Sequence, residues 1–191
     1  PVLDRVSDGE GKIYEKTYDE LLKLDFGVKF SQEFKGLKIP TFEEILQKFS
    51  GKVVMNIHIK IWDLDYLDPK IQEIIDLIRK YNAEDYSYIQ ASNAKTMQKF
   101  MQAAPDIHCA LGWDGKETGK DLVERAIKIG AHKVQFFKPH YDKEAMELAH
   151  KHGIICNVFW SDEPEEAKES FALGADCILT NKYEETIQAI E

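Results

Sequence analysis

The sequence lacks an excess of positive charge: 25 Lys and Arg residues stand against 34 Asp and Glu residues, for a formal net charge of -9. A field of this sign repels nucleic acids and anionic lipid surfaces, so any phosphate group must be met by a local cluster of positive charge. No stretch approaches the ~18–20 consecutive apolar residues of a membrane span, and the first residues do not resemble a signal peptide. We therefore expect a cytoplasmic protein with no membrane span in this chain and no nucleic-acid partner.

Cysteine is also scarce. Cys109, Cys156 and Cys177 lie in apolar runs, lack the spacing of metal ligands and leave an odd count. This composition argues against a disulfide scaffold and predicts three reduced thiols in the core.

From residue 53 onward, short apolar runs alternate with longer amphipathic ones. The pattern predicts strands at 53–60, 86–92, 107–112, 133–137, 155–160 and 177–180. It predicts helices near 68–81, 93–103, 119–129, 142–152, 163–173 and 183–190, with Asp162 and Pro164 opening the fifth and Gly130, Gly153 and Gly174 closing three of them. Such alternation implies a parallel sheet, either doubly wound and open or closed as a (β/α) barrel.

Residues 1–50 break this rhythm. They are rich in Gly, Asp and Lys, and they end in a helix start at which Thr41 and Glu44 have the spacing of a capping box. We expect an inserted segment at 1–50, followed by repeating β/α units at 51–191, within a single domain of 191 residues.

The predicted strand at 53–60 carries polar residues on one face. Period-two geometry places Asn56, His58 and Lys60 on one side, and Val53, Met55, Ile57 and Ile59 on the other. The apolar side is expected to pack against helices, and the polar side to form the wall of a site.

Six segments together resemble the glycerophosphodiester phosphodiesterase family. The family's D-R-T-T-x-G-x-G, T-x-x-E-L and I-P-T-L-E-E-x-L motifs have counterparts at 4–11, 17–21 and 39–46. Its N-I-E-x-K motif, a strand ending in W-T, and G-x-D-G-I-I-T-D have counterparts at 56–60, 157–160 and 174–181. The resemblance spans essentially the whole chain, and it implies a TIM (β/α)8-type barrel with about six of its eight strands here.

The resemblance implies hydrolysis of glycerophosphodiesters to an alcohol and glycerol 3-phosphate, within lipid metabolism. The family uses two histidines as acid and base and a divalent cation, usually Mg²⁺ or Ca²⁺. Its H-R-G, E-x-D and H-D motifs have no counterpart in this sequence, so no catalytic residue is assigned. We expect the chain to be a fragment that is inactive by itself; the alternative is a reduced homologue. A non-catalytic phosphate-binding or interaction protein also stays open.

Five residues are assigned to the site: His58, Lys60 and Trp160 through the resemblance, and Gln90 and Lys138 because they lie at the ends of predicted strands. His58 stands at the position of a metal-binding carboxylate, and imidazole is a poor ligand for Mg²⁺ and Ca²⁺, so a softer metal or none is also open. The expected substrate-binding residues are Lys60, against the phosphate, Trp160, against the glycerol side, Gln90 and Lys138. Ser92, Gly112 and Trp113 are further candidates at strand ends. The expected partner is a small-molecule phosphodiester, with homo-oligomerisation left open.

The remaining histidines are given no metal role, because they show no paired ligand spacing. The acidic run at 162–166 is interpreted as helix-dipole chemistry in a first turn.

Overall fold

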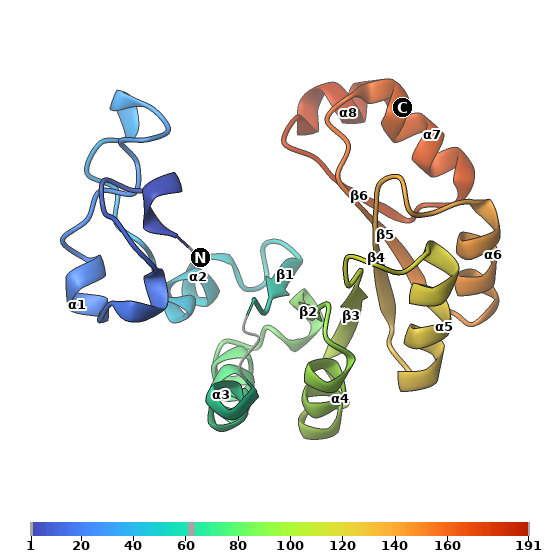
Figure 1. Ribbon diagram of the computed structural model, residues 1–191, viewed down its shortest axis with the longest axis horizontal. Coiled ribbons are helices and arrows are strands. Elements are labelled where there is room, and N and C mark those ends of the chain that lie inside the picture. The colour runs from blue at the N-terminus through green and yellow to red at the C-terminus, as the bar shows by residue number, and fades with distance from the viewer. Residues whose placement is uncertain (1, 61–63, 191) are drawn as a thin grey trace. The chain divides into compact units, whose positions relative to one another are not determined.

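The computed structural model describes residues 2–60 and 64–190 (Figure 1). Its contacts divide the chain into two compact units, Pro1–Lys48 and Phe49–Glu191. This boundary lies within two or three residues of the expected division between the N-terminal segment and the β/α units. Whether both belong to one domain stays a prediction.

The first unit is built from short helical turns. They are η1 (Leu3–Arg5), η2 (Ile13–Glu15), α1 (Tyr18–Leu21), η3 (Gln32–Phe34) and α2 (Phe42–Phe49). The predicted capping box at the start of α2 is confirmed: the Glu44 amide donates to Thr41 Oγ1 at 3.1 Å, and the Thr41 amide donates to Glu44 Oε2 at 2.7 Å. A second capping box, between Thr17 and Glu20, starts α1.

The Asp25 carboxylate organises the loop that follows α1. Its Oδ1 accepts from the amides of Gly27 and Val28, and its Oδ2 accepts from the amide of Gly36 at 2.7 Å. Desolvation opposes ionisation, but these backbone donors outweigh it and lower the pKa of Asp25. Gly27 is required here because a Cβ would lie 1.7 Å from the carbonyl oxygen of Phe34.

The second unit holds one sheet of six parallel strands in the order β1-β2-β3-β4-β5-β6. The strands are β1 (Met55–His58), β2 (Ser87–Ala91), β3 (His108–Gly112), β4 (Lys133–Phe137), β5 (Ile155–Phe159) and β6 (Cys177–Leu179). The helical elements between and after them are α3 (Leu64–Lys80), η4 (Glu84–Tyr86), α4 (Ala94–Ala103), α5 (Gly119–Ile129), α6 (Lys143–Lys151), α7 (Pro164–Leu173) and α8 (Tyr183–Ile190). All six predicted strands and the predicted helices are confirmed within a few residues at each end.

Side-chain contacts across the inner face show that the sheet is curved. Asn157 on β5 donates to the hydroxyl of Tyr88 on β2 at 3.2 Å, although two strands separate them. Asn56 on β1 donates to Gln135 on β4 at 3.5 Å. In a flat sheet these residues would be three strand spacings of about 4.8 Å each apart. The six strands therefore form a half-barrel of the TIM-barrel type.

The outer face of the sheet is apolar and covered by helices. Ile89, Leu111 and Phe136 are at most 1% exposed, and α4 packs on β2 and β3 while α5 packs on β3 and β4 (Figure 1). Parallel sheets are buried in this way because each crossover helix lies on the sheet. The predicted glycine stops are confirmed as well: Gly130 and Gly174 end α5 and α7 in the left-handed conformation, and Gly153, which follows α6, adopts it too.

Three expectations need correction. The first strand is shorter than predicted because Val53 lies in the turn after α2. Its side chain is 48% exposed, and its amide donates to the carbonyl of Phe49. Cys109 and Cys156 are buried as expected, but Cys177 is exposed because β6 is the edge strand of this sheet. Asp162 does not cap α7; Glu163 occupies the N-cap position without a side-chain hydrogen bond.

None of the described helices is both long enough and apolar enough to cross a membrane.

Candidate functional site

A pocket of about 370 Å³ lies at the carboxyl ends of β1, β2 and β3. We call it the β1–β3 pocket. The chain reaches it from four places: the end of β1, the β2–α4 turn, the loop after β3, and helix α5. Its lining residues are His58, Ile59, Lys60, Ala91, Ser92, Asn93, Ala94, Asp114 and Arg125.

Two positive groups, Lys60 and the N-terminus of α4, face this pocket, whose described lining also includes the exposed carboxylate of Asp114. Lys60 is exposed and forms no ion pair with any residue that the structure describes. The N-terminus of α4 opens onto the same space, capped by Asn93, whose Oδ1 accepts from the amides of Lys95 and Thr96. A helix N-terminus carries partial positive charge, so it adds to the ammonium group of Lys60. These two groups can attract an anion, and the Asp114 carboxylate opposes them.

His58 is neutral near pH 7 in this setting. Partial desolvation by the surrounding protein, followed by the charge of Lys60, lowers the pKa of His58 below its usual value of 6.5. The imidazole is still solvent-accessible at the pocket rim. It can therefore donate a hydrogen bond through one ring nitrogen and accept a proton at the other.

Arg125 holds the floor of the pocket together. Its guanidinium reaches from α5 to the carbonyl of Ser92 at 2.8 Å and that of Gly112 at 3.0 Å, and so joins the ends of β2 and β3. It also forms a bidentate pair with Glu117, of which the Nε–Oε2 distance is 2.9 Å. Arg125 is thus neutralised by Glu117 and holds the strand ends in position. Lys60 is the exposed cation among the described lining residues.

The described residues of the pocket do not by themselves fit a divalent cation. Asp114 is the carboxylate in the described lining of this pocket, but its Oδ1 already accepts from the amides of Lys116 and Glu117. Where the structure is described, the group of three ligand side chains close enough to hold a metal lies elsewhere. Lys60 further disfavours a cation here. The metal role of His58 stays a prediction that requires additional ligands.

A second pocket, of about 380 Å³, lies at the carboxyl ends of β4 and β5, and we call it the β4–β5 pocket. Aromatic rings form one wall: Phe159 lies 5.4 Å from Phe137 and 5.2 Å from Trp160, between ring centroids. Trp160 is 44% exposed, and its indole N–H donates to Asp162 at 3.1 Å. The full lining is Phe137, Lys138, Phe159, Trp160, Asp162, Glu163 and Glu166.

Charged side chains form the opposite wall of the β4–β5 pocket. Lys138 pairs with Glu166, and Ser161 donates to the same carboxylate at 3.0 Å. These two partners, Lys138 first, lower the pKa of Glu166. Asp162 accepts from the amide of Asn181 at 2.7 Å, so it fastens the β6–α8 loop instead of capping α7. Glu166 does lie in the first turn of α7 as expected, but its ion pair gives it a second role.

The predicted site residues are therefore divided between two pockets. His58 and Lys60 lie in the β1–β3 pocket, and Trp160 and Lys138 lie in the β4–β5 pocket. Gln90 lines neither: it is 2% exposed on the inner face of β2, where it accepts from Asn56 at 2.6 Å. The substrate-binding role of these side chains stays a prediction.

The three further candidates also have different surroundings. Ser92 lines the β1–β3 pocket, and a Cβ on Gly112 would lie 3.1 Å from the Ser92 hydroxyl, which would have to shift by a few tenths of an ångström. Trp113 stacks between Phe137 and His140, at 5.3 and 4.3 Å between centroids. It belongs to the aromatic wall beside the β4–β5 pocket.

Sequence reasoning missed several pocket residues. Arg125 has the pattern of an exposed helix charge, because its reach to two strand ends depends on tertiary structure. Asn93 could have been found, since an asparagine between a strand and an amphipathic run is a recognisable N-cap. Phe137 and Phe159 were assigned to strands, but their places at strand ends indicate the same edge as Trp160.

A curved parallel sheet with helices on its outer face and pockets at the carboxyl ends of its strands defines the TIM-barrel class, in which ligand sites lie at this edge. Comparison with known proteins identifies the family within this fold class. The sequence profile of the glycerophosphoryl diester phosphodiesterase family matches residues 1–185. The chain belongs to this family, whose members are phosphoric diester hydrolases and generally depend on a divalent metal.

Individual relatives agree with the profile. The glycerophosphodiester phosphodiesterase of Caldanaerobacter subterraneus subsp. tengcongensis is 30% identical over 193 residues, which cover 98% of this chain and 76% of that protein. That of Bacillus altitudinis is 22% identical, covering 94% of this chain and 74% of that protein. A phosphodiesterase of Oleispira antarctica, solved in complex with the product sn-glycerol-3-phosphate, superposes with a TM-score of 0.85 at 19% identity, covering 99% of this chain and 76% of that one.

Proposed function

We propose that the protein hydrolyses glycerophosphodiesters to an alcohol and glycerol 3-phosphate, and that the 191 residues described by this sequence bind the phosphodiester without hydrolysing it alone. Family membership supports the reaction class. The observation that carries the binding role is the β1–β3 pocket, in which Lys60, without an ion pair to any described residue, and the N-terminus of α4 face one space. Oxygen anions of a phosphodiester are the ligands that such a pair attracts.

The β4–β5 pocket fits one of the ester groups. Its aromatic wall offers apolar surface to the carbon skeleton of an alcohol or of glycerol, while Trp160 keeps its indole N–H on Asp162. Lys138 is a weaker phosphate ligand than Lys60 because its charge is already paired with Glu166. We therefore assign the phosphate to Lys60 and an ester group to the surface around Trp160.

The inactivity of the chain by itself is proposed from the chemistry of the lining. Phosphodiester cleavage needs a base for the entering oxygen and an acid for the leaving one. Among the described lining residues of the two pockets, His58 is the single imidazole, and the Asp114 and Glu166 carboxylates are engaged with loop amides and with Lys138. The metal dependence of the family would require ligands beyond the described lining of these two pockets, since the described group of three ligand side chains lies elsewhere.

Calorimetry with sn-glycerol 3-phosphate tests the binding role. Lys60→Met should weaken binding by roughly 10-fold or more, because it removes a charge-assisted hydrogen bond worth about 1.5–3 kcal/mol. Lys128→Met is the matched control, since Lys128 is an exposed lysine in the last turn of α5, away from the pocket lining. Equal affinity in the two variants would remove the β1–β3 pocket from the proposal.

One observation favours a second candidate, a phosphate-binding or interaction protein without catalysis. His58 lies where the resemblance expects a carboxylate, and the described pocket does not fit a divalent cation. Release of glycerol 3-phosphate from glycerophosphodiesters should be measured with the natural gene product and with the 191-residue chain. Turnover by the first establishes the enzyme. Binding without turnover by either establishes the second candidate, and turnover by the 191-residue chain refutes its proposed inactivity.

A further inference from the structure

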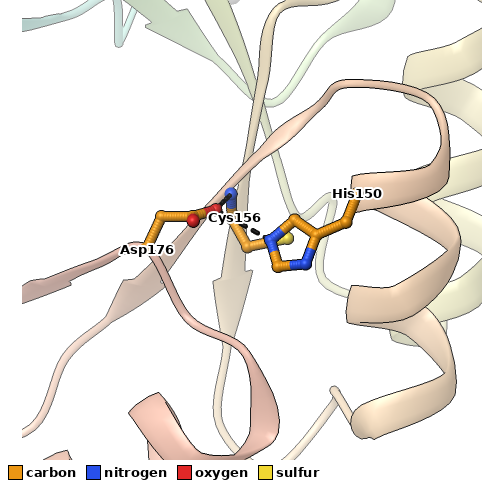
Figure 2. A group of neighbouring side chains, drawn as sticks. All are labelled: His150, Cys156 and Asp176. Carbon is orange, nitrogen blue, oxygen red and sulfur yellow. Dashed lines mark hydrogen bonds and ion pairs between the residues drawn. The ribbon is translucent and has the colours of Figure 1, made fainter.

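Three side chains of different ligand types meet at the amino-terminal edge of the sheet, opposite the two pockets. His150 lies in the last turn of α6, Cys156 is the second residue of β5, and Asp176 directly precedes β6. Their potential ligand atoms, an imidazole nitrogen, the thiol sulfur and a carboxylate oxygen, all lie within 4.8 Å of one another. Figure 2 shows the three side chains converging from a helix, a strand and a loop.

The spacing of this cluster is close to that of a tetrahedral metal site. With Zn–N and Zn–O bonds of about 2.0–2.1 Å and a Zn–S bond of about 2.3 Å, neighbouring ligand atoms lie about 3.3–3.6 Å apart. His150 Nε2 and Asp176 Oδ2 are already 2.9 Å apart, so the pair needs to open by only a few tenths of an ångström. A rotation of exposed side chains suffices for this, since His150 and Asp176 are both solvent-accessible.

We propose that His150, Cys156 and Asp176 form a zinc site, with water as the fourth ligand. The ligand set of one nitrogen, one sulfur and one oxygen suits Zn²⁺ and Co²⁺, whereas Mg²⁺ and Ca²⁺ require oxygen ligands. The site is separate from the metal expected at the carboxyl edge, and it does not depend on the proposed catalytic function.

An ordinary structural explanation accounts for only part of the cluster. Asp176 Oδ2 accepts from the Cys156 amide at 2.7 Å, and the same contact recurs two strands earlier, where His132 Nδ1 accepts from the Cys109 amide at 3.2 Å. This repeat explains why a polar side chain directly precedes β4 and β6. It does not account for a thiol sulfur within 4.8 Å of both the Asp176 carboxylate and the His150 imidazole.

The surroundings of the cluster leave room for the imidazole and give the thiol no strong partner. Gly174 has a φ of +114°, which favours glycine in the turn before Asp176, and a Cβ there would meet His150 Cε1 at an ordinary contact distance of 3.5 Å. The Cys156 sulfur makes only a weak contact, 3.9 Å from the carbonyl of Ile154. Burial first, and then Asp176, raise the pKa of Cys156 to about 12, so the thiol carries its proton until a metal displaces it.

Binding releases one proton from the Cys156 thiol to solvent, and a zinc–thiolate bond forms in its place. His150 binds through Nε2, which in the metal-free chain donates to Asp176; the neutral imidazole therefore changes tautomer, and its proton moves through solvent from Nε2 to Nδ1. Asp176 keeps a carboxylate oxygen on the Cys156 amide. The metal would join the end of α6 to β5 and to the turn before β6. Residues at the amino face of such barrels serve stability, so we expect a structural role.

Titration of the 191-residue chain with Co²⁺ tests the site directly. We expect one equivalent to bind, with visible bands of tetrahedral cobalt and a near-ultraviolet thiolate-to-cobalt charge-transfer band. Cys156→Ala should abolish the charge-transfer band. Cys109→Ala is the matched control, because Cys109 is an equally buried thiol with its own histidine contact, and it should leave the spectrum unchanged.

A second variant keeps the test decisive if Cys156→Ala fails to fold. His150→Ala alters an exposed side chain and should weaken Zn²⁺ affinity by on the order of 100-fold or more, since even secondary partners of ligands contribute 10- to 100-fold. His58→Gln should leave zinc affinity unchanged, which separates this site from any metal at the β1–β3 pocket. Cobalt binding without a thiolate band, no cobalt binding, or affinity insensitive to His150→Ala would each overturn the proposal.

Discussion

The pair formed by Arg125 and Glu117 predicts a large loss of stability in Arg125→Met. Both side chains are poorly exposed, at 23% and 10%. Methionine keeps the apolar stem but leaves the Glu117 carboxylate and the carbonyls of Ser92 and Gly112 without their donor. Removing one partner of a buried pair costs about 3–5 kcal/mol. Glu117 keeps one donor, the amide of Asp114 at 3.1 Å, so we expect the lower end, about 3 kcal/mol.

Urea unfolding followed by circular dichroism measures this loss. For a chain of this size, about 3 kcal/mol corresponds to a fall in Tm of roughly 6–12 °C. Arg79→Met is the control, because the ion pair of Arg79 with Asp106 is 42% and 51% exposed and should contribute less than about 1 kcal/mol. Adding Glu117→Gln to Arg125→Met should recover part of the loss. A loss in Arg125→Met no larger than in Arg79→Met would refute the structural role assigned to Arg125.

Two further predictions concern other parts of the chain. Burial, and after it the neighbouring charges, lowers the pKa of His132 below its unfolded value of 6.5. The folded protein therefore has its full stability above pH 6.5, and the free energy of unfolding declines as the pH falls below that value, because the unfolded chain binds the proton more tightly. His132→Asn should flatten the decline in unfolding free energy between pH 7 and 5, and an unchanged slope would contradict this. Gly27→Ala places a Cβ against the Phe34 carbonyl, so amides of residues 1–48 should exchange hydrogen faster while those of the sheet do not; equal exchange throughout would contradict it.

The β/α order could be predicted because each element carries its own local signal. Strands β2 to β6 are apolar runs bounded by glycine or polar residues, and Gly130 and Gly174 end their helices as the sequence indicates. Local signals fail where a neighbour decides the outcome. Cys177 lies in an apolar run but is exposed, because its strand has a partner on one side only in this sheet.

The site was less predictable than the fold for the same reason. Strand-end positions indicate the carboxyl edge, and His58, Lys60, Trp160 and Lys138 all line pockets there, while their role in binding stays a prediction. The division into two pockets depends on which loops approach each other across the sheet, and periodicity carries no information on that. Gln90 faces the inside of the sheet as the alternation predicts, but it is buried below the pockets, where it accepts a hydrogen bond from Asn56 on the neighbouring strand.

His58 links the fold to the open question of the metal. A neutral imidazole leaves Lys60 and the N-terminus of α4 as the positive groups of the described β1–β3 pocket, against the carboxylate of Asp114, and we propose that these groups take a phosphate in preference to a divalent cation. His58→Glu restores the carboxylate that the family resemblance expects and places a negative charge in the same pocket. At an effective dielectric constant near 20, like charges across such a pocket repel by about 1–2 kcal/mol, or roughly 10-fold in affinity.

Calorimetry should therefore show weaker binding of glycerol 3-phosphate to His58→Glu in the absence of metal, together with stronger binding of Mn²⁺. His58→Gln is the control, since it removes the imidazole and adds no charge. Equal binding of glycerol 3-phosphate by the two variants, with no gain in affinity for Mn²⁺ in either, would refute the claim that the charge at position 58 sets the ligand preference of the pocket. If only His58→Glu gains affinity for Mn²⁺, the identity of the side chain at position 58 decides whether this pocket prefers a cation or an anion, and the imidazole favours the anion.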